Sequence, residues 1–179
     1  AIDEANFGKD HPTVAIRLNN LASLLQATNR LSEAEPLMRR ALAIDEASFG
    51  KDHPEVATDL NNLAQLLQAT NRLAEAEPLM RRALAIDEAS FGKDHPKVAI
   101  RLNNLAQLLQ ATNRLAEAEP LMRRGLEILL KFTVANGHRH PNLGAGLNNY
   151  QTLLTARGDT DDQARAKITA LAAEYGLSE

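Results

Sequence analysis

Three consecutive stretches of 42 residues are nearly copies of one another, and this period constrains the fold more than any single residue does. The copies are Ala1–Leu42, Ala43–Leu84 and Ala85–Leu126; the first two agree at 36 of 42 positions and the last two at 38 of 42. A fixed period of this size is typical of stacked-repeat architectures and not of an enzyme with one central core. Each copy must bury its apolar faces against its neighbours, so functional residues are expected on the surface that the stack displays.

Each copy is predicted to form two antiparallel helices. In the first copy, Pro12 suits the opening turn of a helix, and Asp10 is expected to cap it. Apolar residues then recur at helical spacing, namely Val14, Leu18, Leu21, Ala22 and Leu25. The pattern predicts a first helix that runs to about Thr28 and a turn at Asn29 and Arg30.

The second helix of each copy has a broader apolar arc, which indicates neighbours on two sides. In the first copy this arc consists of Ala34, Leu37, Met38, Ala41, Leu42 and Ile44. Ser32 and Glu35 match the spacing of a capping box, and Gly50 is expected to end the helix in a left-handed conformation. The predicted fold is an all-α solenoid of stacked antiparallel helix hairpins.

The two ends of the chain differ from the central copies. Residues 1–8 match residues 43–50 closely, so residues 1–10 are expected to be the end of a truncated upstream repeat. Repeats are expected at 11–52, 53–94 and 95–139, followed by a degenerate capping repeat at 140–179. A bare apolar side at the truncated end favours end-to-end self-association.

Composition and motifs argue against several function classes. The net charge of −3 provides no basic face for nucleic acid or a membrane surface, and no apolar run is long enough to span a bilayer. The chain has no cysteine and no phosphate-loop, zinc-protease or serine-hydrolase motif; Gly144-Ala145-Gly146 is too short to identify a nucleotide site. We expect a cytoplasmic protein that is not an enzyme and that binds no cofactor, nucleic acid or membrane.

Histidines recur once per copy, at His11, His53 and His95, and two more, His138 and His140, lie near the last loop. Ligands of one zinc ion lie within about 4 Å of each other, whereas equivalent atoms in stacked helices are about 8–10 Å apart. The repeated histidines are therefore expected to serve loops or helix caps, and no metal site is predicted.

The repeated unit reads VAxxLNNLAxLLQATNRLAEAEPLMRRALAIDEASFGKDHP, and it resembles the 42-residue tetratricopeptide repeat of the kinesin light chain type. The packing positions of that family match Ala34, Met38 and Ala41 in the second helix. The resemblance implies a tetratricopeptide superhelix whose concave groove binds partners. Near-identical copies look like the recently duplicated arrays of bacterial regulatory proteins, so a bacterial array is expected.

Most positions that vary between copies avoid the apolar packing stripe and, on the first helix, fall on the opposite arc. The resemblance implies that this arc lines the groove. The candidate peptide-binding residues are Ile16, Asn20, Ser23, Thr58, Asn62, Gln65, Ile100, Asn104, Gln107 and Asn149. Asparagine amides can both donate to and accept from a peptide backbone, so a row of them suits an extended peptide. One change, from Ala83 to Gly125, lies on the packing side instead.

Two further columns of residues lie beside this arc. Asn19, Asn61 and Asn103 are expected to join one repeat to the next. A second column, Arg17, Asp59 and Arg101, alternates in sign and is expected to be a solvated face whose exposed pairs contribute at most about 1 kcal/mol.

The first functional hypothesis is a protein-interaction scaffold that holds an extended peptide or a partner helix in the groove. An alternative is that the array is the sensor or autoinhibitory part of a larger signalling protein with an ATPase or protease domain upstream. A structural spacer without a ligand remains a further alternative. Replacing Asn62 and Asn104 by alanine separates a groove that binds from a spacer that does not.

Overall fold

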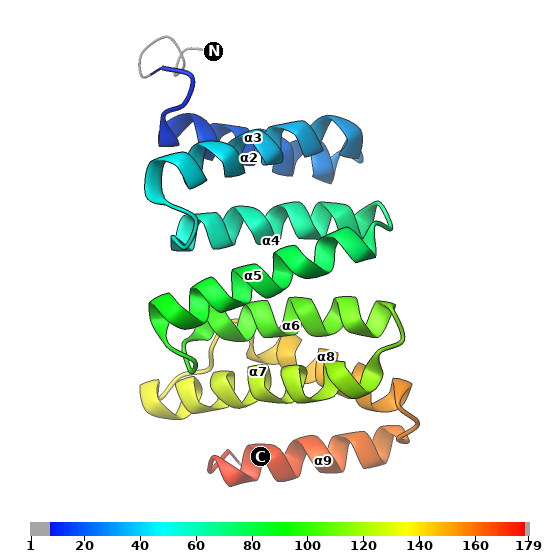
Figure 1. Cartoon of the computed structure of the whole chain (residues 1–179). Helices are drawn as coiled ribbons and strands as arrows, with labels where there is room; N and C mark the ends of the chain where they lie inside the picture. The colour runs from blue at the N-terminus through cyan, green and yellow to red at the C-terminus, as the bar shows by residue number, and fades with distance from the viewer. Residues whose placement is uncertain (1–7, 178–179) are drawn as a thin grey trace. The chain divides into compact units, whose positions relative to one another are not determined.

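The structure is a computed structural model that describes residues 8–177, which form eight helices and no strand. They divide into two compact units, Ala1–Ser90 and Phe91–Glu179, and helices run antiparallel within each unit (Figure 1). The N-terminal unit contains α2 (Pro12–Ala27), α3 (Leu31–Phe49), α4 (Pro54–Ala69) and all but the last residue of α5 (Leu73–Phe91). The C-terminal unit contains α6 (Pro96–Ala111), α7 (Leu115–Asn136), α8 (Leu143–Ala156) and α9 (Asp161–Glu174). The predicted all-α arrangement of helix hairpins is confirmed.

The core of the N-terminal unit is built from small and branched aliphatic side chains. One buried cluster joins α2 to α3 and consists of Val14, Ala15, Ala41 and Ile44. The next cluster joins α4 to α5 and consists of Val56, Ala57, Leu60, Ala83 and Ile86, with Leu42 of α3 packed against it. The alanines allow neighbouring helices to approach closely, which explains how a core with so few aromatic residues is filled.

Asparagine makes the turn inside each hairpin. Asn29, Asn71 and Asn113 have φ values of 59°, 59° and 58°, which is the left-handed region. Asparagine tolerates this conformation better than other residues with a side chain. The N–H of Arg30 then donates to the carbonyl oxygen of Leu25 at 2.8 Å and closes the end of the first helix.

Histidine, not aspartate, caps the first helix of each hairpin. Nδ1 of His11 accepts a hydrogen bond from the N–H of Thr13 at 3.2 Å, and His53 and His95 accept the equivalent bond at 3.2 Å. The expectation that Asp10 caps this helix is therefore wrong by one residue. The expected cap role of the repeated histidines is confirmed, because the imidazole before the proline occupies the N-cap position itself.

The link between the two hairpins of the N-terminal unit is short and ordered by two ring groups. Gly50 ends α3 with a φ of 87°, a positive value that glycine adopts without strain. The ring of Phe49 stacks on that of His53, with 4.6 Å between the ring centroids. The same side chain that caps α4 is thus held against the last residue of α3.

The predicted capping box at Ser32 and Glu35 does not form. Arg30 occupies the N-cap position of α3, and its side chain makes no capping hydrogen bond. Glu35 instead pairs with Arg39 in the same helix and with Arg72 of the next hairpin, each at 2.7 Å. The carboxylate that was expected to close a helix end therefore links adjacent hairpins.

An apolar surface remains exposed on α2. Leu21 is 47% exposed and Leu24 is 61% exposed, whereas the equivalent Leu63 and Leu66 of α4 are 1% and 0% exposed. The expectation that Leu21 belongs to the packed stripe is wrong for the first copy, because no described helix covers that side of α2. The predicted end of an upstream second helix falls mainly on residues 1–7, which lie outside the described residues.

The last two helices depart from the repeat sequence, but a histidine-to-backbone hydrogen bond is retained before the first of them. The N–H of Asn142 donates to Nδ1 of His140 at 3.1 Å, as in the earlier histidine caps. Helix α9 begins with a capping box between Thr160 and Gln163, and it buries Ala164 and Leu171. Between residues 8 and 177, none of the helices is long and apolar enough to cross a membrane.

Candidate functional site

The ten predicted binding residues lie on the first helix of each hairpin, and each is exposed or half-buried. In the N-terminal unit they are Ile16, Asn20 and Ser23 on α2 and Thr58, Asn62 and Gln65 on α4. In the C-terminal unit they are Ile100, Asn104 and Gln107 on α6 and Asn149 on α8. Their side chains are therefore placed where a partner could reach them, and their use as ligand contacts stays a prediction.

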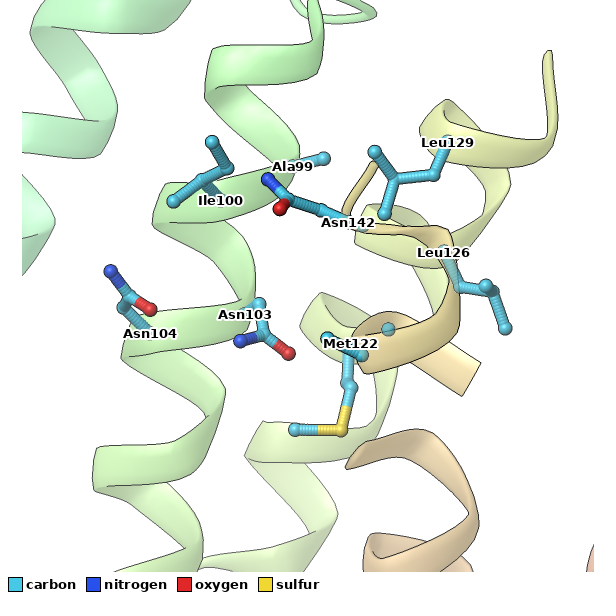
Figure 2. A pocket seen from close by; sticks show the side chains of 11 residues that line it. Ala99, Ile100, Asn103, Asn104, Met122, Leu126, Leu129 and Asn142 are labelled. Carbon is cyan, nitrogen blue, oxygen red and sulfur yellow. The ribbon is translucent and has the colours of Figure 1, made fainter. Parts of the chain in front are cut away.

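A cavity of about 200 Å³ lies in the C-terminal unit, between α6, α7 and the start of α8. Its lining consists of Ala99, Ile100, Asn103, Asn104, Met122, Gly125, Leu126, Leu129, Asn142, Ala145 and Gly146. Figure 2 shows the asparagine amides of α6 and of the loop before α8 on one side, and Met122, Leu126 and Leu129 on the other. Two predicted residues, Ile100 and Asn104, belong to this lining, whereas Gln107 and Asn149 do not.

Two glycines line this cavity. Gly125 stands where the earlier copies have Ala41 and Ala83, both of which are fully buried. Gly146 stands, when the fourth unit is aligned on its Leu-Asn-Asn sequence, where the second copy has Asp59. A Cβ atom at Gly146 would lie 3.2 Å from the Cδ1 atom of Leu129, so any side chain there would enter the lined space.

The amides at the cavity differ in their hydrogen bonding. Nδ2 of Asn149 donates to Oδ1 of Asn103 at 3.0 Å. The candidate residue Asn149 is therefore outside the lining but orients Asn103, which belongs to it. The backbone N–H of Asn142 binds His140, but its side chain makes no capping bond to α8. The bonds of Asn149 with Asn103, and of Asn19 with Asp59 at 2.6 Å, confirm that this asparagine column joins neighbouring repeats.

Sequence reasoning predicted two of the eleven lining residues as binding residues, and two glycines among the other nine interrupt the repeat pattern. The replacement of alanine by Gly125 and the sequence Gly144-Ala145-Gly146 both break the repeat pattern. Neither feature suggests a chemical role by itself. The cavity depends on how α6, α7 and α8 pack together, so it cannot be predicted from either position alone.

A second notable site lies in the N-terminal unit, where two buried carboxyl groups meet. Asp45 of α3 and Asp59 of α4 are 4% and 2% exposed. Burial raises the pKa of Asp59 to about 7, and the adjacent charge of Asp45 adds to the increase, while the hydrogen bond from Asn19 opposes it. Burial also raises the pKa of Asp45. The pair is therefore expected to share a proton near neutral pH.

This pair corrects the expectation of a solvated charge column. Asp59 is buried, and the equivalent Arg101 is also buried at 9% exposure. Oδ1 of Asp45 and Oδ2 of Asp59 accept no hydrogen bond from the described residues, which is consistent with a proton held between the two carboxyl groups. The expectation is therefore wrong for Asp59 and Arg101, which lie on the packed side of their helices, whereas Arg17 of the first copy is exposed as expected.

The histidines near the last loop contact a phenylalanine. The ring of Phe132 lies edge-on to His138 and His140, with centroid distances of 5.8 Å and 4.9 Å. Burial lowers the pKa of His140, and the nearby His138 adds to this effect. No group of three or more potential metal ligands occurs in the part of the chain that the structure describes.

Comparison with known proteins gives three results. A family model described as a tetratricopeptide repeat matches residues 1–47, 13–89 and 61–131. Two crystal structures of a kinesin light chain-like protein with nearly identical repeats from Podospora anserina are similar, with TM-scores of 0.76 and 0.75 at 21% and 24% identity. They align with 98% and 99% of this chain and with 82% and 83% of theirs.

A third similar structure is BtubC from P. vanneervenii, with a TM-score of 0.75 at 24% identity, over 92% of this chain and 65% of that one. These similarities establish a common fold, that of a kinesin light chain-like repeat solenoid. No curated protein matches the chain.

Proposed function

Because the chain belongs to the tetratricopeptide repeat family, we propose that it is a protein-interaction scaffold that holds an extended peptide or a partner helix against the first helix of its hairpins. Repeats of this family generally mediate protein–protein interactions. The proposed contacts are the ten residues predicted from the sequence. The observation that supports the proposal most directly is the cavity beside Ile100 and Asn104, because ligand sites combine an apolar hollow with a few polar groups.

The proposed contacts suit recognition of a backbone more than of one particular sequence. Asn62 and Asn104 occupy equivalent positions on α4 and α6, and both are half-buried. An amide at such a position can donate to a peptide carbonyl and accept from a peptide N–H. Ile100 adds an exposed apolar side chain next to Asn104 in the cavity lining. No step in this role requires catalysis.

The experiment uses linear peptides from a displayed library, selected on the purified chain and then titrated in solution. Replacing both Asn62 and Asn104 by alanine is expected to weaken the selected peptides at least about tenfold, because two hydrogen bonds to the backbone are lost. The matched control is Asn148→Ala, an exposed asparagine of α8 outside the proposed contacts. Failure to select any peptide, or equal binding by the double variant and the control, would contradict the proposal.

We also propose that the exposed face of α2 supports self-association. Leu21 and Leu24 are exposed, whereas the equivalent leucines of the second and third copies are buried. A second copy of the chain offers helix surfaces of the same aliphatic character, and covering large exposed leucines is favourable.

A further inference from the structure

We propose that the cavity of the C-terminal unit takes one uncharged apolar side chain, of the size of leucine or phenylalanine, from the bound peptide. The inference rests on the proposed function, because a peptide held against α6 brings its side chains to Ile100 and Asn104. The occupant is identified by the volume, the lining and the polar groups of the cavity.

The volume suits a single large apolar side chain. A cavity of about 200 Å³ exceeds the roughly 150 Å³ of an engineered apolar protein cavity that stays dry and binds benzene. Aliphatic groups supply most of its walls, including Met122, Leu126 and Leu129. The lining residues include no charged side chain, so a lysine, arginine, aspartate or glutamate would enter without a partner.

The site belongs to one place in the stack and not to every repeat. In the first two copies, Ala41 and Ala83 stand in place of Gly125 and are fully buried members of apolar clusters. A Cβ atom at Gly125 would lie 3.2 Å from the backbone oxygen of Ala99, so the glycine allows α7 to approach α6 more closely at this point. Gly146 leaves open the position of a full side chain in the second and third copies. The third hairpin and the capping helix therefore form a specific anchor point.

The amides around the cavity are placed to hold the backbone of the same residue. The side chain of Asn142 makes no capping hydrogen bond to α8 and points toward Ala99 and Ile100 of α6 (Figure 2). Asn103 is held in place by Asn149 through its oxygen. Amide groups at these positions can pair with the peptide groups that flank the anchored side chain.

The test uses N-acetyl-leucine methylamide, a single capped leucine residue, titrated into the full chain while backbone amide shifts are followed by NMR. Saturable shifts are expected at Ile100, Asn104 and Gly146, and the capped alanine and lysine analogues are expected to bind at least about tenfold more weakly, because burial of a leucine side chain is worth about that factor or more.

The decisive variant is Gly146→Ala. Its added methyl group would lie 3.2 Å and 3.7 Å from the Cδ1 atoms of Leu129 and Leu126, which are flexible ends of side chains, so it fills the cavity without moving backbone. Alanine favours helix more than glycine does, so the variant is expected to fold. Binding of the capped leucine is expected to fall at least about fivefold. The matched control is Gly144→Ala in the same helix, where a Cβ atom meets open space.

The outcomes separate this inference from the proposed function. Absence of saturable shifts at the cavity, or equal binding by Gly146→Ala and Gly144→Ala, would overturn the inference even if library peptides bind and respond to Asn104→Ala. If capped leucine binds and Gly146→Ala weakens that binding, the inference is supported even when the library yields no peptide. A library that yields no peptide would count against the scaffold role alone.

Discussion

At the scale of single residues, Asp45 and Asp59 form a contact whose strength depends on pH. Asp59 lies against Asp45 of α3 and Asn19 of α2. The charge of Glu55 raises the pKa of both aspartates, and that of His53 lowers the pKa of Asp45. The third copy has Arg101 at the equivalent position, so the like-charged arrangement is a property of the second copy. Replacement by asparagine would keep the size of the side chain and remove one charge.

The raised pKa of Asp59 predicts that stability falls as pH rises. The folded chain holds a proton up to about pH 7, whereas an unfolded aspartate releases it near pH 3.9. The free energy of unfolding should therefore decrease between about pH 4 and pH 7, by up to about 1.4 kcal/mol per pH unit, and level off above. In Asp59→Asn this contribution should be absent. Urea unfolding of both proteins at pH 5, 6, 7 and 8 measures the difference.

The comparison between the two proteins removes the contributions of other titrating groups. A stability difference between the wild type and Asp59→Asn that stays constant from pH 5 to pH 8 would show that the pair does not share a proton.

Residue-level expectations from the sequence succeeded where the local pattern determines the structure. The turn at Asn29 follows from the side chain's tolerance of positive φ. The cap was assigned to Asp10 instead of His11 because the His-Pro step places the imidazole one residue closer to the helix. The burial of Asp59 could not be foreseen, because it depends on which side of α4 faces α3.

At the scale of elements, the left-handed asparagine determines how tightly each hairpin closes. Asn71 has a φ of 59° between α4 and α5. Asn71→Ala is expected to lower the free energy of unfolding by about 1 kcal/mol, because alanine resists this conformation, while Asn71→Gly should change it by less than about 0.5 kcal/mol. Urea unfolding measures both variants.

The helical asparagine Asn148 provides the control for this prediction. Asn148→Ala removes the same atoms from an exposed site inside α8, where alanine is the better helix former. Equal losses in Asn71→Ala and Asn148→Ala would indicate that the backbone conformation of the turn is not the source of the effect.

The helices could be predicted because the same apolar pattern recurs in three copies of the repeat. Pro12 and Thr28 correctly bracketed the first helix. The second helix was given the wrong cap because Glu35 fits two roles, and only the position of Arg72 in the neighbouring hairpin decides between them. The cavity escaped prediction for a similar reason, since Gly125 and Gly146 come from different elements.

At the scale of the whole molecule, the exposed leucines of α2 predict association between chains. The sedimentation coefficient is expected to rise with concentration, because a second copy covers Leu21 and Leu24. The double variant Leu21→Glu and Leu24→Glu should remain monomeric over the same range. Sedimentation velocity over a concentration series tests both.

A matched control removes an exposed apolar side chain elsewhere. Val134 of α7 is also exposed, so Val134→Glu changes charge and hydropathy without altering the face of α2. A wild type that stays monomeric at all concentrations, or a control that behaves like the double variant, would refute the role of this face.

The carboxyl pair between α3 and α4 has a mechanical consequence. When a stack of hairpins is pulled at its ends, it extends as neighbouring hairpins separate from each other. Aliphatic contacts resist such a pull equally at all pH values, but the junction that contains Asp45 and Asp59 holds a proton in acid and a repulsive charge in base. The force needed to open that junction should therefore decline as pH rises from 5 to 8, and single-molecule force spectroscopy would register the decline.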